Sequence, residues 1–322
     1  MSDKPVVLCL GDSHTLGVCG APWVPGLAAA LPRLRYVNTG VNGTQAKNVH
    51  SRLEKLILGV RGKLAGVTLL IGTNDCLLAL AQETNDFWGQ QHYMLNNGYT
   101  GPANVDTFRK QYRELTADIA ERLRQRAAAS GSGSEPIKLM IVTLPPIGEA
   151  LDDKANKRVD EYNTVIREAT AELQLQQQAL DTADGLRIIL LDLSAACKAA
   201  IERAFGKAAG DDDGGSSDAT GAVAAALPPQ PQPLRLPSPH WRVGLGVATC
   251  MVRRYVFGIS YEQQSRQAGT VVLAPDCIHL NETGARLLID LVEGQLRAPA
   301  DETGPGPGSN PAAGTRPGAV GG

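Results

Sequence analysis

The sequence is poor in aromatic residues, in net charge and in long apolar runs, and each shortage narrows what the protein can be. Only 4% of the 322 residues are aromatic although 43% are hydrophobic, so Leu, Val, Ile and Ala must fill most of the core. The 31 Lys and Arg nearly balance the 33 Asp and Glu, which leaves no field of one sign to attract nucleic acid or an anionic membrane. No apolar run approaches the length of a membrane span. We therefore expect a small-molecule partner, with no nucleic acid and no membrane span.

Motifs for metals, nucleotides and disulfides are also missing. The chain has no HExxH helix, no Walker A loop, no metal-spaced Cys and His set and no GxSxG elbow of the α/β-hydrolase class. We therefore expect no metal and no cofactor. No signal peptide is evident around 1–10 and no CxxC pair occurs, so we expect a cytoplasmic protein with free thiols. The six scattered cysteines are Cys9, Cys19, Cys76, Cys197, Cys250 and Cys277.

Composition separates an ordered part of the chain from three segments that resemble disordered sequence. Residues 127–135 are rich in Ala, Ser and Gly, 206–239 combine an Asp run with Pro and Gln, and 298–322 are rich in Gly, Pro and Ala. Such segments bury too little apolar surface to offset the chain entropy lost on folding. We expect one domain over 1–297, with a low-complexity insertion at 206–239 and a helical insertion at 241–266, followed by a disordered tail at 298–322.

Short apolar runs alternate with segments of helical periodicity along the rest of the chain. The runs predict buried strands at 6–10, 35–39, 67–71, 137–143 and 187–191. The periodicity predicts helices at 27–31, 49–58, 105–123, 159–178 and 280–296, the third with Asn104 or Asp106 as its N-cap. Alternating βα units predict a parallel sheet with helices on both faces, a three-layer αβα sandwich. Ligands of such sheets bind beyond the carboxyl ends of the strands, so the residues that follow each strand are the candidates for chemistry.

Polar residues follow each of the first three strands. The first ends in Gly11-Asp12-Ser13-His14, which predicts an exposed Ser13 at the start of a helix, where the positive end of the helix dipole favours an oxyanion. The second is followed by the glycine-rich segment 38–44, and the third by Gly72-Thr73-Asn74-Asp75, in which Asn74 can donate a hydrogen bond. Each pattern is also an ordinary turn, because Ser often caps helices and Gly, Asn and Asp are common turn residues.

A histidine that can serve as a base lies near the other end of the ordered sequence. A serine hydroxyl is a poor nucleophile until a neighbouring base takes its proton. His279 can do this if a carboxylate holds its imidazole in the right tautomer, and Asp276 lies three residues earlier, in a turn before the last helix. The alternative is a histidine near a helix start with an aspartate that forms the turn. The chain has only five histidines, which favours the functional pairing.

In this order, the blocks together resemble the SGNH/GDSL hydrolases. The resemblance covers about 6–296 except 206–239, and implies a five-stranded parallel sheet in the flavodoxin-like strand order 2-1-3-4-5. Three of the blocks, Leu144 through Glu149, Tyr162-Asn163 and Asp276 through Gly284, look like a bacterial-type branch of that family. The blocks that carry the resemblance are Gly11-Asp12-Ser13, a glycine after the second strand, Gly72-Thr73-Asn74-Asp75, Leu144 through Glu149, Tyr162-Asn163 and Asp276 through Gly284.

The resemblance implies a role for each of five residues. Ser13 would be the nucleophile, His279 the base, and Asp276 the carboxylate that orients the base. The backbone N–H groups of Ser13 and Gly43 and the side chain of Asn74 would form the oxyanion hole.

Three positions near the proposed site residues either leave a choice between two residues or differ from the family's usual sequence. Gly43 is preferred to Gly40 because the second block resembles Asn-x-Gly-x-x-Gly, with the later glycine as donor. His14 stands where the family name has Leu, and we expect it to point away from the Ser13 side chain and to be structural. Cys277 occupies a variable position inside the Asp-His turn.

The implied activity is hydrolysis of an acyl ester through an acyl-enzyme, without cofactor or metal. Acetyl esters, lysophospholipids, thioesters and acetylated sugars all suit such a site. The same residues would also serve an acyltransferase or a thioesterase, and a catalytically silent αβα module that binds a small molecule stays open.

Two segments are candidates for shaping the substrate. The segment 82–102 holds four of the chain's Phe, Trp and Tyr residues, and is either a lid or pocket wall or a loop that packs on itself. The helical insertion at 241–266 covers either the site or only the edge of the sheet.

Overall fold

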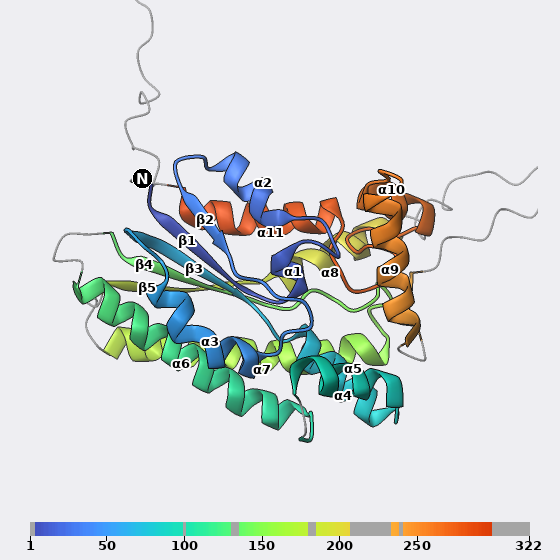
Figure 1. Cartoon of the computed structure of the whole chain (residues 1–322), viewed down its shortest axis with the longest axis horizontal. Helices are drawn as coiled ribbons and strands as arrows, with labels where there is room; N and C mark the ends of the chain where they lie inside the picture. Colours follow the sequence, from blue (N-terminus) through green and yellow to red (C-terminus); the bar gives the residue numbers. More distant parts are fainter. Residues whose placement is uncertain are drawn as a thin grey trace, which may run out of the picture.

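Five parallel strands form the centre of the fold. The computed structural model describes residues 4–98, 101–129, 135–179, 185–206, 233–237 and 241–297. In this part of the chain the sheet has the order β2-β1-β3-β4-β5, so the expected strand order and αβα class are confirmed (Figure 1). The strands are β1 (Val6–Gly11), β2 (Arg35–Asn38), β3 (Leu64–Leu70), β4 (Ile137–Val142) and β5 (Leu186–Leu191), each within three residues of its predicted bounds.

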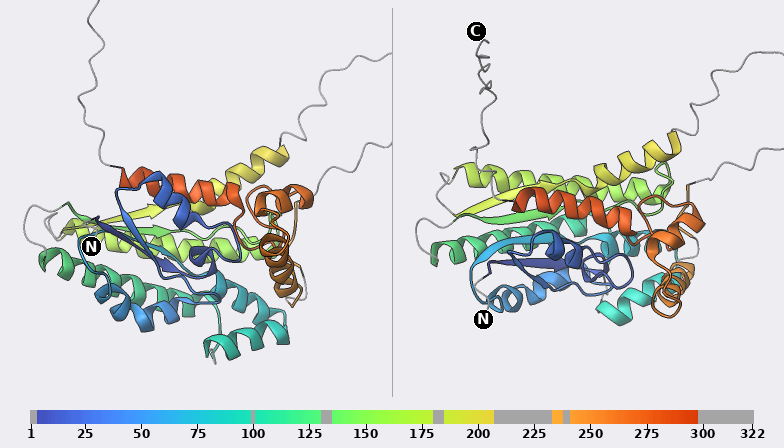
Figure 2. Two further views of the ribbon diagram at one scale, coloured as in Figure 1. Left: turned by 45° about the horizontal axis from the view of Figure 1, so that its top comes forward. Right: turned by 90° about the horizontal axis from the view of Figure 1, so that it is seen from above.

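Helices cover both faces of the sheet, and further helices lie at the carboxyl end of its strands (Figures 1 and 2). One face carries α2 (Trp23–Ala30), α8 (Leu193–Gly206) and α11 (Glu282–Leu296). The other carries α3 (Ala46–Leu58), α6 (Val105–Ala129) and α7 (Lys154–Ala179). The carboxyl end of the sheet holds α1 (Ser13–Leu16), α4 (Thr73–Glu83), α5 (Phe87–Asn97), α9 (Trp241–Tyr255) and α10 (Tyr261–Ala268).

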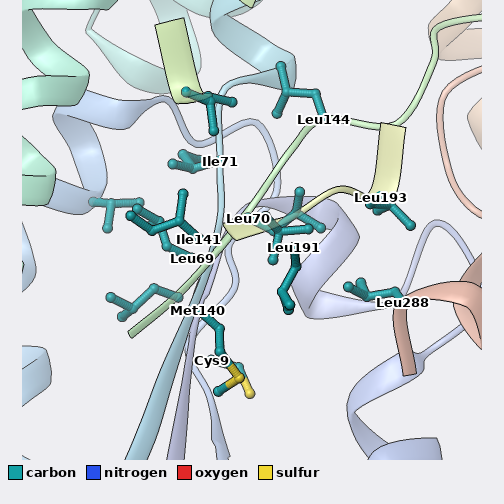
Figure 3. Close-up of a cluster of buried hydrophobic side chains, with 14 of the residues drawn as sticks. Cys9, Leu69, Leu70, Ile71, Met140, Ile141, Leu144, Leu191, Leu193 and Leu288 are labelled. Carbon is teal, nitrogen blue, oxygen red and sulfur yellow. The ribbon is translucent and has the colours of Figure 1, made fainter. Parts of the chain in front are cut away.

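Aliphatic side chains fill the core, as the shortage of aromatic residues requires. Every residue of β1 is buried because helices cover both faces of this central strand. Burial of one Leu, Ile or Val side chain contributes roughly 1.5–3 kcal/mol to the stability of the fold. The buried side chains of the strands, and of the residues that follow the strands, therefore stabilise the sheet together. Figure 3 shows this packing for Cys9, Leu69, Leu70, Ile71, Met140, Ile141, Leu144, Leu191, Leu193 and Leu288.

The helix predicted at 105–123 is confirmed in α6. Its inward face is buried, and Phe108 stacks on Tyr162 of α7 with ring centroids 4.6 Å apart. The side chain of Asn104 accepts the N–H of Thr107 at 2.8 Å, so Asn104 rather than Asp106 caps the helix. The buried residues of the predicted stripe are Phe108, Tyr112, Leu115, Ile119 and Leu123.

Parts of three segments that were expected to be irregular are ordered in the structure. The helix α6 continues to Ala129, through the start of the predicted loop at 127–135, because alanine is the strongest helix former. Most of 82–102 is helical, since α4 runs to Glu83 and α5 spans Phe87–Asn97. Within the predicted low-complexity insertion, α8 includes Gly206, and the Leu234 carbonyl accepts the Glu149 N–H at 2.7 Å.

The other expectations for these segments concern residues that the structure does not describe. These are 130–134, 207–232, 238–240, the predicted tail 298–322, and Tyr99 of the segment 82–102. The division into one domain with a tail therefore stays a prediction.

No helix among the described residues is both long and apolar enough to cross a membrane. The six cysteines are all free and buried.

Candidate active site

The sheet brings distant segments together at the carboxyl ends of its strands. Gly11, the last residue of β1, pairs with Leu70, the last residue of β3. The register therefore sets Ser13, at the start of α1, near Asn74, at the start of α4. His279 comes from the turn before α11, and its Nε2 lies 2.9 Å from Ser13 Oγ although 266 residues separate the two in sequence.

A continuous line of hydrogen bonds joins Ser13, His279 and Asp276. The His279 ring lies 2.9 Å from each partner, with Nδ1 facing Asp276 Oδ2 and Nε2 facing Ser13 Oγ. Because an ionised carboxylate only accepts, the proton belongs on Nδ1, and Nε2 is left to accept from the Ser13 hydroxyl. All three side chains are buried. The arrangement thus aims a basic nitrogen at a hydroxyl in surroundings poor in water.

The turn that carries Asp276 and His279 is built around its own carboxylate. Oδ1 of Asp276 accepts the N–H groups of Ile278 and His279, each at 2.9 Å, while Oδ2 binds the imidazole. Cys277 has a φ of 66°, a left-handed conformation that costs a non-glycine residue about 1–2 kcal/mol. Its carbonyl accepts the Gly148 N–H at 2.7 Å, which fixes the turn against the segment after β4. One side chain therefore both closes the turn and orients the ring.

Burial and pairing have opposite effects on these two ionisable groups. Burial alone would lower the pKa of His279, but the charge and hydrogen bond of Asp276, with the charge of Asp12, hold it above its ordinary value. Burial alone would raise the pKa of Asp276, but the His279 charge and N–H and the two backbone N–H groups hold it below its ordinary value. The carboxylate is therefore ionised at neutral pH, and the imidazole loses its proton at a higher pH than an ordinary histidine.

Ser13 is more enclosed than the sequence predicts. Its side chain was expected at the surface, but the residue is only 8% exposed, with His279 hydrogen-bonded to its hydroxyl. The helix that it begins has only four residues, so its dipole is much smaller than that of a long helix. Asp12 caps this helix by accepting the N–H of His14 at 3.0 Å.

His14 lies against the ring of His279, a contact that the sequence did not predict. The two ring centroids are 5.4 Å apart with an angle of 44° between the ring planes. Burial, and then the charge of His279, lower the pKa of His14 to about 3 although Asp276 opposes them. Neither ring nitrogen of His14 has a hydrogen-bond partner among the described residues. The ring is therefore a neutral neighbour of the His279 imidazole at any pH near neutrality.

Asn74 lies between the turn after β1 and the loop after β2. Its Nδ2 donates to the Thr44 carbonyl at 2.9 Å and makes a longer contact of 3.4 Å with Asp12 Oδ2. Its Oδ1 accepts from the hydroxyl of Tyr93 at 3.3 Å. Thr44 directly follows Gly43, so the amide lies next to the glycine that the resemblance singles out.

The two glycines of the loop after β2 have different surroundings. A Cβ on Gly40 would come within 2.3 Å of the Leu16 nitrogen, so only glycine allows the loop to pack this closely on α1. The N–H of Gly40 donates to Asn38 Oδ1 at 3.0 Å and is thus engaged within the loop. The Gly40 N–H is therefore used inside the loop and is not directed toward Ser13.

Two buried carboxyl groups, those of Asp12 and Asp75, lie beside Ser13 and Asn74 in the sequence. Burial raises the pKa of Asp12 to about 7, opposed by the N–H of His14 and the charge of His279. Burial also raises the pKa of Asp75 to about 7, opposed by the hydrogen bond from Ala46. That bond, 3.2 Å from the Ala46 N–H to Asp75 Oδ2, ties the first turn of α4 to the start of α3.

Glu149 belongs to a block that resembles the family, but the sequence predicted no role for it. Its buried carboxylate accepts the N–H groups of Val271, Val272 and Leu273 at 2.8–3.0 Å. Leu273 in turn pairs with Leu280 across the turn that holds Asp276 and His279. Glu149 therefore fixes the backbone on which that turn is built. Sequence spacing carries no signal for such a contact, because the partners are backbone groups.

The predicted helical insertion forms α9 and α10 and lies beside the Asp276 turn. The hydroxyls of Tyr255 and Tyr261 both donate to the Val18 carbonyl, at 2.9 and 2.8 Å. A Cβ on Gly246 would lie 3.5 Å from the Cα of Asp276. The insertion therefore contacts the site itself. Within the described ranges, no group of three His, Cys, Asp or Glu residues is placed to hold a metal ion.

Solved structures similar to this chain include two acetylxylan esterases and one further enzyme. The acetylxylan esterase Axe2 from Geobacillus stearothermophilus is 16% identical, with 92% of this chain and 96% of that chain covered and a TM-score of 0.48. The acetyl xylan esterase AlAXEase is 15% identical, with coverages of 90% and 98% and a TM-score of 0.47. LAE5, an alpha/beta hydrolase enzyme from the metagenome of Lake Arreo in Spain, is 18% identical, with coverages of 92% and 96% and a TM-score of 0.46.

A family model gives the decisive comparison. No curated protein sequence gives a match. The model of the GDSL-like lipase/acylhydrolase family matches residues 9–213, which is well over half of the chain and includes Ser13, Gly43 and Asn74. The chain belongs to the GDSL-like lipase/acylhydrolase family and is a hydrolase that acts on esters.

Proposed function

We propose that this ester hydrolase uses Ser13 as nucleophile, His279 as general base and Asp276 as the carboxylate that orients the base. The observation that carries the proposal is the unbroken line from Asp276 Oδ2 through the imidazole to Ser13 Oγ, with 2.9 Å at each contact. A general base must lie within this distance of the proton that it removes. The low pKa of Asp276 supports the proposal as well, because the carboxylate stays charged while the imidazole gains a proton.

The proposed reaction has two steps that share one proton path. Ser13 Oγ attacks the carbonyl carbon of the ester while its proton passes to His279 Nε2. The tetrahedral intermediate then breaks the bond to the leaving alcohol, which takes the proton from the imidazolium, and the acyl group stays on Ser13. Water next attacks the acyl carbon and gives a proton to Nε2. Collapse of the second intermediate breaks the bond to Ser13 Oγ, returns the proton to it and releases the acid.

Three donors would stabilise the negative charge on the tetrahedral oxygen: the N–H groups of Ser13 and Gly43 and the side chain of Asn74. One N–H of Asn74 makes a normal hydrogen bond with Thr44, but the 3.4 Å contact with Asp12 is at the long limit for a hydrogen bond. The second N–H can therefore turn to a stronger, charged acceptor as the oxyanion develops.

Labelling with a fluorophosphonate probe tests the proposal directly. The activated serine oxygen displaces fluoride and forms a covalent bond to phosphorus, and mass spectrometry should locate the adduct on Ser13. Ser13→Ala and His279→Ala should each lose labelling and the hydrolysis of p-nitrophenyl acetate. Ser194→Ala is the matched control, since Ser194 is also buried at the start of a helix, α8. Activity of Ser13→Ala within about tenfold of wild type, only ~1.4 kcal/mol of barrier, would contradict the assignment.

A further inference from the structure

Asn74 contacts a residue of α5, which lies in the segment 82–102 that was expected to be either a lid or pocket wall or a loop that packs on itself. The turn between α4 and α5 contains Asn85 in a left-handed conformation, with φ 52°, and Asp86 caps α5 by accepting the Gly89 N–H at 3.2 Å. A Cβ on Gly89 would lie 2.9 Å from the Cβ of Ala81, so α5 folds back closely on α4. This helical hairpin returns the chain from Asn74 to a contact with its own first turn.

The contact is made by Tyr93, a buried residue of α5. Its hydroxyl lies 3.3 Å from Asn74 Oδ1. A carboxamide oxygen only accepts, so the hydroxyl must donate. Burial, followed by the charges of Asp75 and Asp12, raises the pKa of Tyr93 far above its ordinary value, so the hydroxyl keeps its proton. The outward side of the same helix carries the exposed rings of Phe87 and Trp88, which are 61% and 65% exposed.

The direction of the Asn74 amide matters because only its NH2 end can stabilise an oxyanion. Two acceptors, the Thr44 carbonyl and the Asp12 carboxylate, face Nδ2, and one donor, the Tyr93 hydroxyl, faces Oδ1. A reversed amide would set its oxygen against the Thr44 carbonyl at 2.9 Å, where two acceptors repel.

We infer that Tyr93 is a positioning residue of the oxyanion hole: its hydroxyl anchors the carbonyl end of Asn74, so that Nδ2 is presented to the oxyanion. The inference rests on the proposed role of Asn74. By this inference the segment 82–102 acts in catalysis through the inward hydroxyl of Tyr93. This role is independent of any contact that its exposed rings make.

Tyr93→Phe tests the inference because it removes the hydroxyl and keeps the buried ring. A neutral hydrogen bond contributes about 1 kcal/mol, so kcat for p-nitrophenyl acetate should fall roughly fivefold to tenfold while KM stays unchanged. The acid limb of the pH profile should not move, because it belongs to His279. Tyr112→Phe is the matched control. Tyr112 is also buried, and its hydroxyl has no hydrogen-bond partner in the described part of the chain, so its loss should leave kcat unchanged.

A double-mutant comparison shows whether the effect passes through Asn74. In the Asn74→Ala background, Tyr93→Phe should change kcat by less than twofold, because the group that the hydroxyl anchors is gone. An equal loss in both backgrounds would overturn the inference, as would a Tyr93→Phe enzyme with normal kcat. A raised KM with unchanged kcat would also overturn it, since Tyr93 would then contact the substrate.

The same experiments separate this inference from the proposed function. If Ser13→Ala keeps its activity, the proposed nucleophile is wrong, and if Asn74→Ala keeps its kcat, the proposed oxyanion hole is wrong. If both lose activity as expected and only Tyr93→Phe behaves like wild type, the site stands and the role of Tyr93 falls.

Discussion

Asn74 is the side chain whose removal should separate chemistry from binding. Asn74→Ala should lower kcat by roughly 10²–10³ with little change in KM, because the hydrogen bond to the substrate oxygen strengthens only as negative charge develops. Steady-state kinetics with p-nitrophenyl acetate measures both constants. A raised KM with normal kcat would make Asn74 a substrate-binding group, and the oxyanion hole would need another donor.

The pKa of His279 should set the acid limb of the pH profile. The neutral imidazole is the active base, and pairing with Asp276 raises its pKa, so kcat/KM of the wild type should fall with acid from a pH above the ordinary histidine value of about 6.5. Asp276→Asn removes the largest raising contribution and leaves burial, which lowers the pKa. The limb should therefore move to lower pH, while the rate drops by orders of magnitude because an amide can hold the wrong tautomer.

His14→Gln is the control for this pH profile. The pKa of His14 is lowered to about 3, so its ring carries no charge in the measured range and its replacement should leave the limb in place. If His14→Gln abolished the limb, or Asp276→Asn left it unmoved, the base would have to be sought elsewhere.

Among single residues, the sequence predicted those that belong to a recognisable motif. It missed those whose role depends on one contact with a residue far away in the sequence. Ser13, Asn74 and the Asp276–His279 turn follow strands or precede a helix, and such positions converge in a parallel sheet. Tyr93 contacts the site through the amide oxygen of Asn74, and Glu149 through backbone N–H groups such as that of Val272. Such contacts impose no spacing pattern. The burial of Ser13 was missed for a related reason, because its cover comes from 266 residues away.

Glu149 should affect stability and activity by anchoring the segment 271–273, without taking part in the reaction itself. Glu149→Ala would leave the N–H groups of Val271, Val272 and Leu273 without their acceptor, at about 1–3 kcal/mol for each that water cannot reach. The thermal midpoint should fall, and kcat with it, since the Asp276 turn loses its support. Glu149→Gln keeps one acceptor oxygen and should lie between Ala and wild type in both measurements.

The control for Glu149 is Glu172→Gln, which changes an exposed carboxylate paired with Arg113 on the far helices. Surface pairs contribute at most about 1 kcal/mol, so this variant should leave kcat unchanged. Normal activity and stability of Glu149→Ala would show that the turn before α11 holds its shape without this carboxylate.

Elements were predictable where the apolar residues follow the period of a helix or form one continuous run. The buried stripe of α6 follows helical periodicity, and β1 is a continuous apolar run, so both were recognised. The helix α5 was not, because exposed Phe87 and Trp88 lie among polar residues and obscure the pattern. Its start is marked only by the cap of Asp86 and the left-handed Asn85.

For the whole chain, the alternation of strands and helices predicted the layers, while the strand order came from the family resemblance. Alternating βα units require a covered parallel sheet but are compatible with several orders. The order β2-β1-β3-β4-β5 places β1 at the point where the chain reverses its direction across the sheet, and Ser13 follows that strand. Ligands of open parallel sheets bind at such a point, so the topology and the chemistry agree.

The buried carboxyl groups should make the whole protein less stable as the pH rises. Asp12 and Asp75 have pKa values raised to about 7, well above the ordinary value near 4 of an unfolded chain. Between these values the folded state binds more protons than the unfolded state, so the free energy of unfolding falls with pH, by up to about 1.4 kcal/mol per unit for one group. His14, whose pKa is lowered to about 3, has the opposite effect below the ordinary histidine value of about 6.5, but it is one group against two. His279, whose pKa is also raised, loses its stabilising contribution over a higher range. The pKa of Asp276 is lowered, so its contribution is lost only in more acidic solution.

Asp75→Asn tests this dependence without touching the proposed triad. The amide oxygen can still accept the Ala46 N–H, but no charge is buried, so the urea midpoint should change less between pH 5 and pH 8 and should exceed that of wild type at pH 8. Asp290→Asn, an exposed carboxylate paired with Arg286, should leave the wild-type slope intact. A wild-type midpoint that rises from pH 5 to pH 8 would contradict the argument. If it falls as expected, catalysis and folding oppose each other, because neutral His279 needs the higher pH at which the buried carboxylates destabilise the fold.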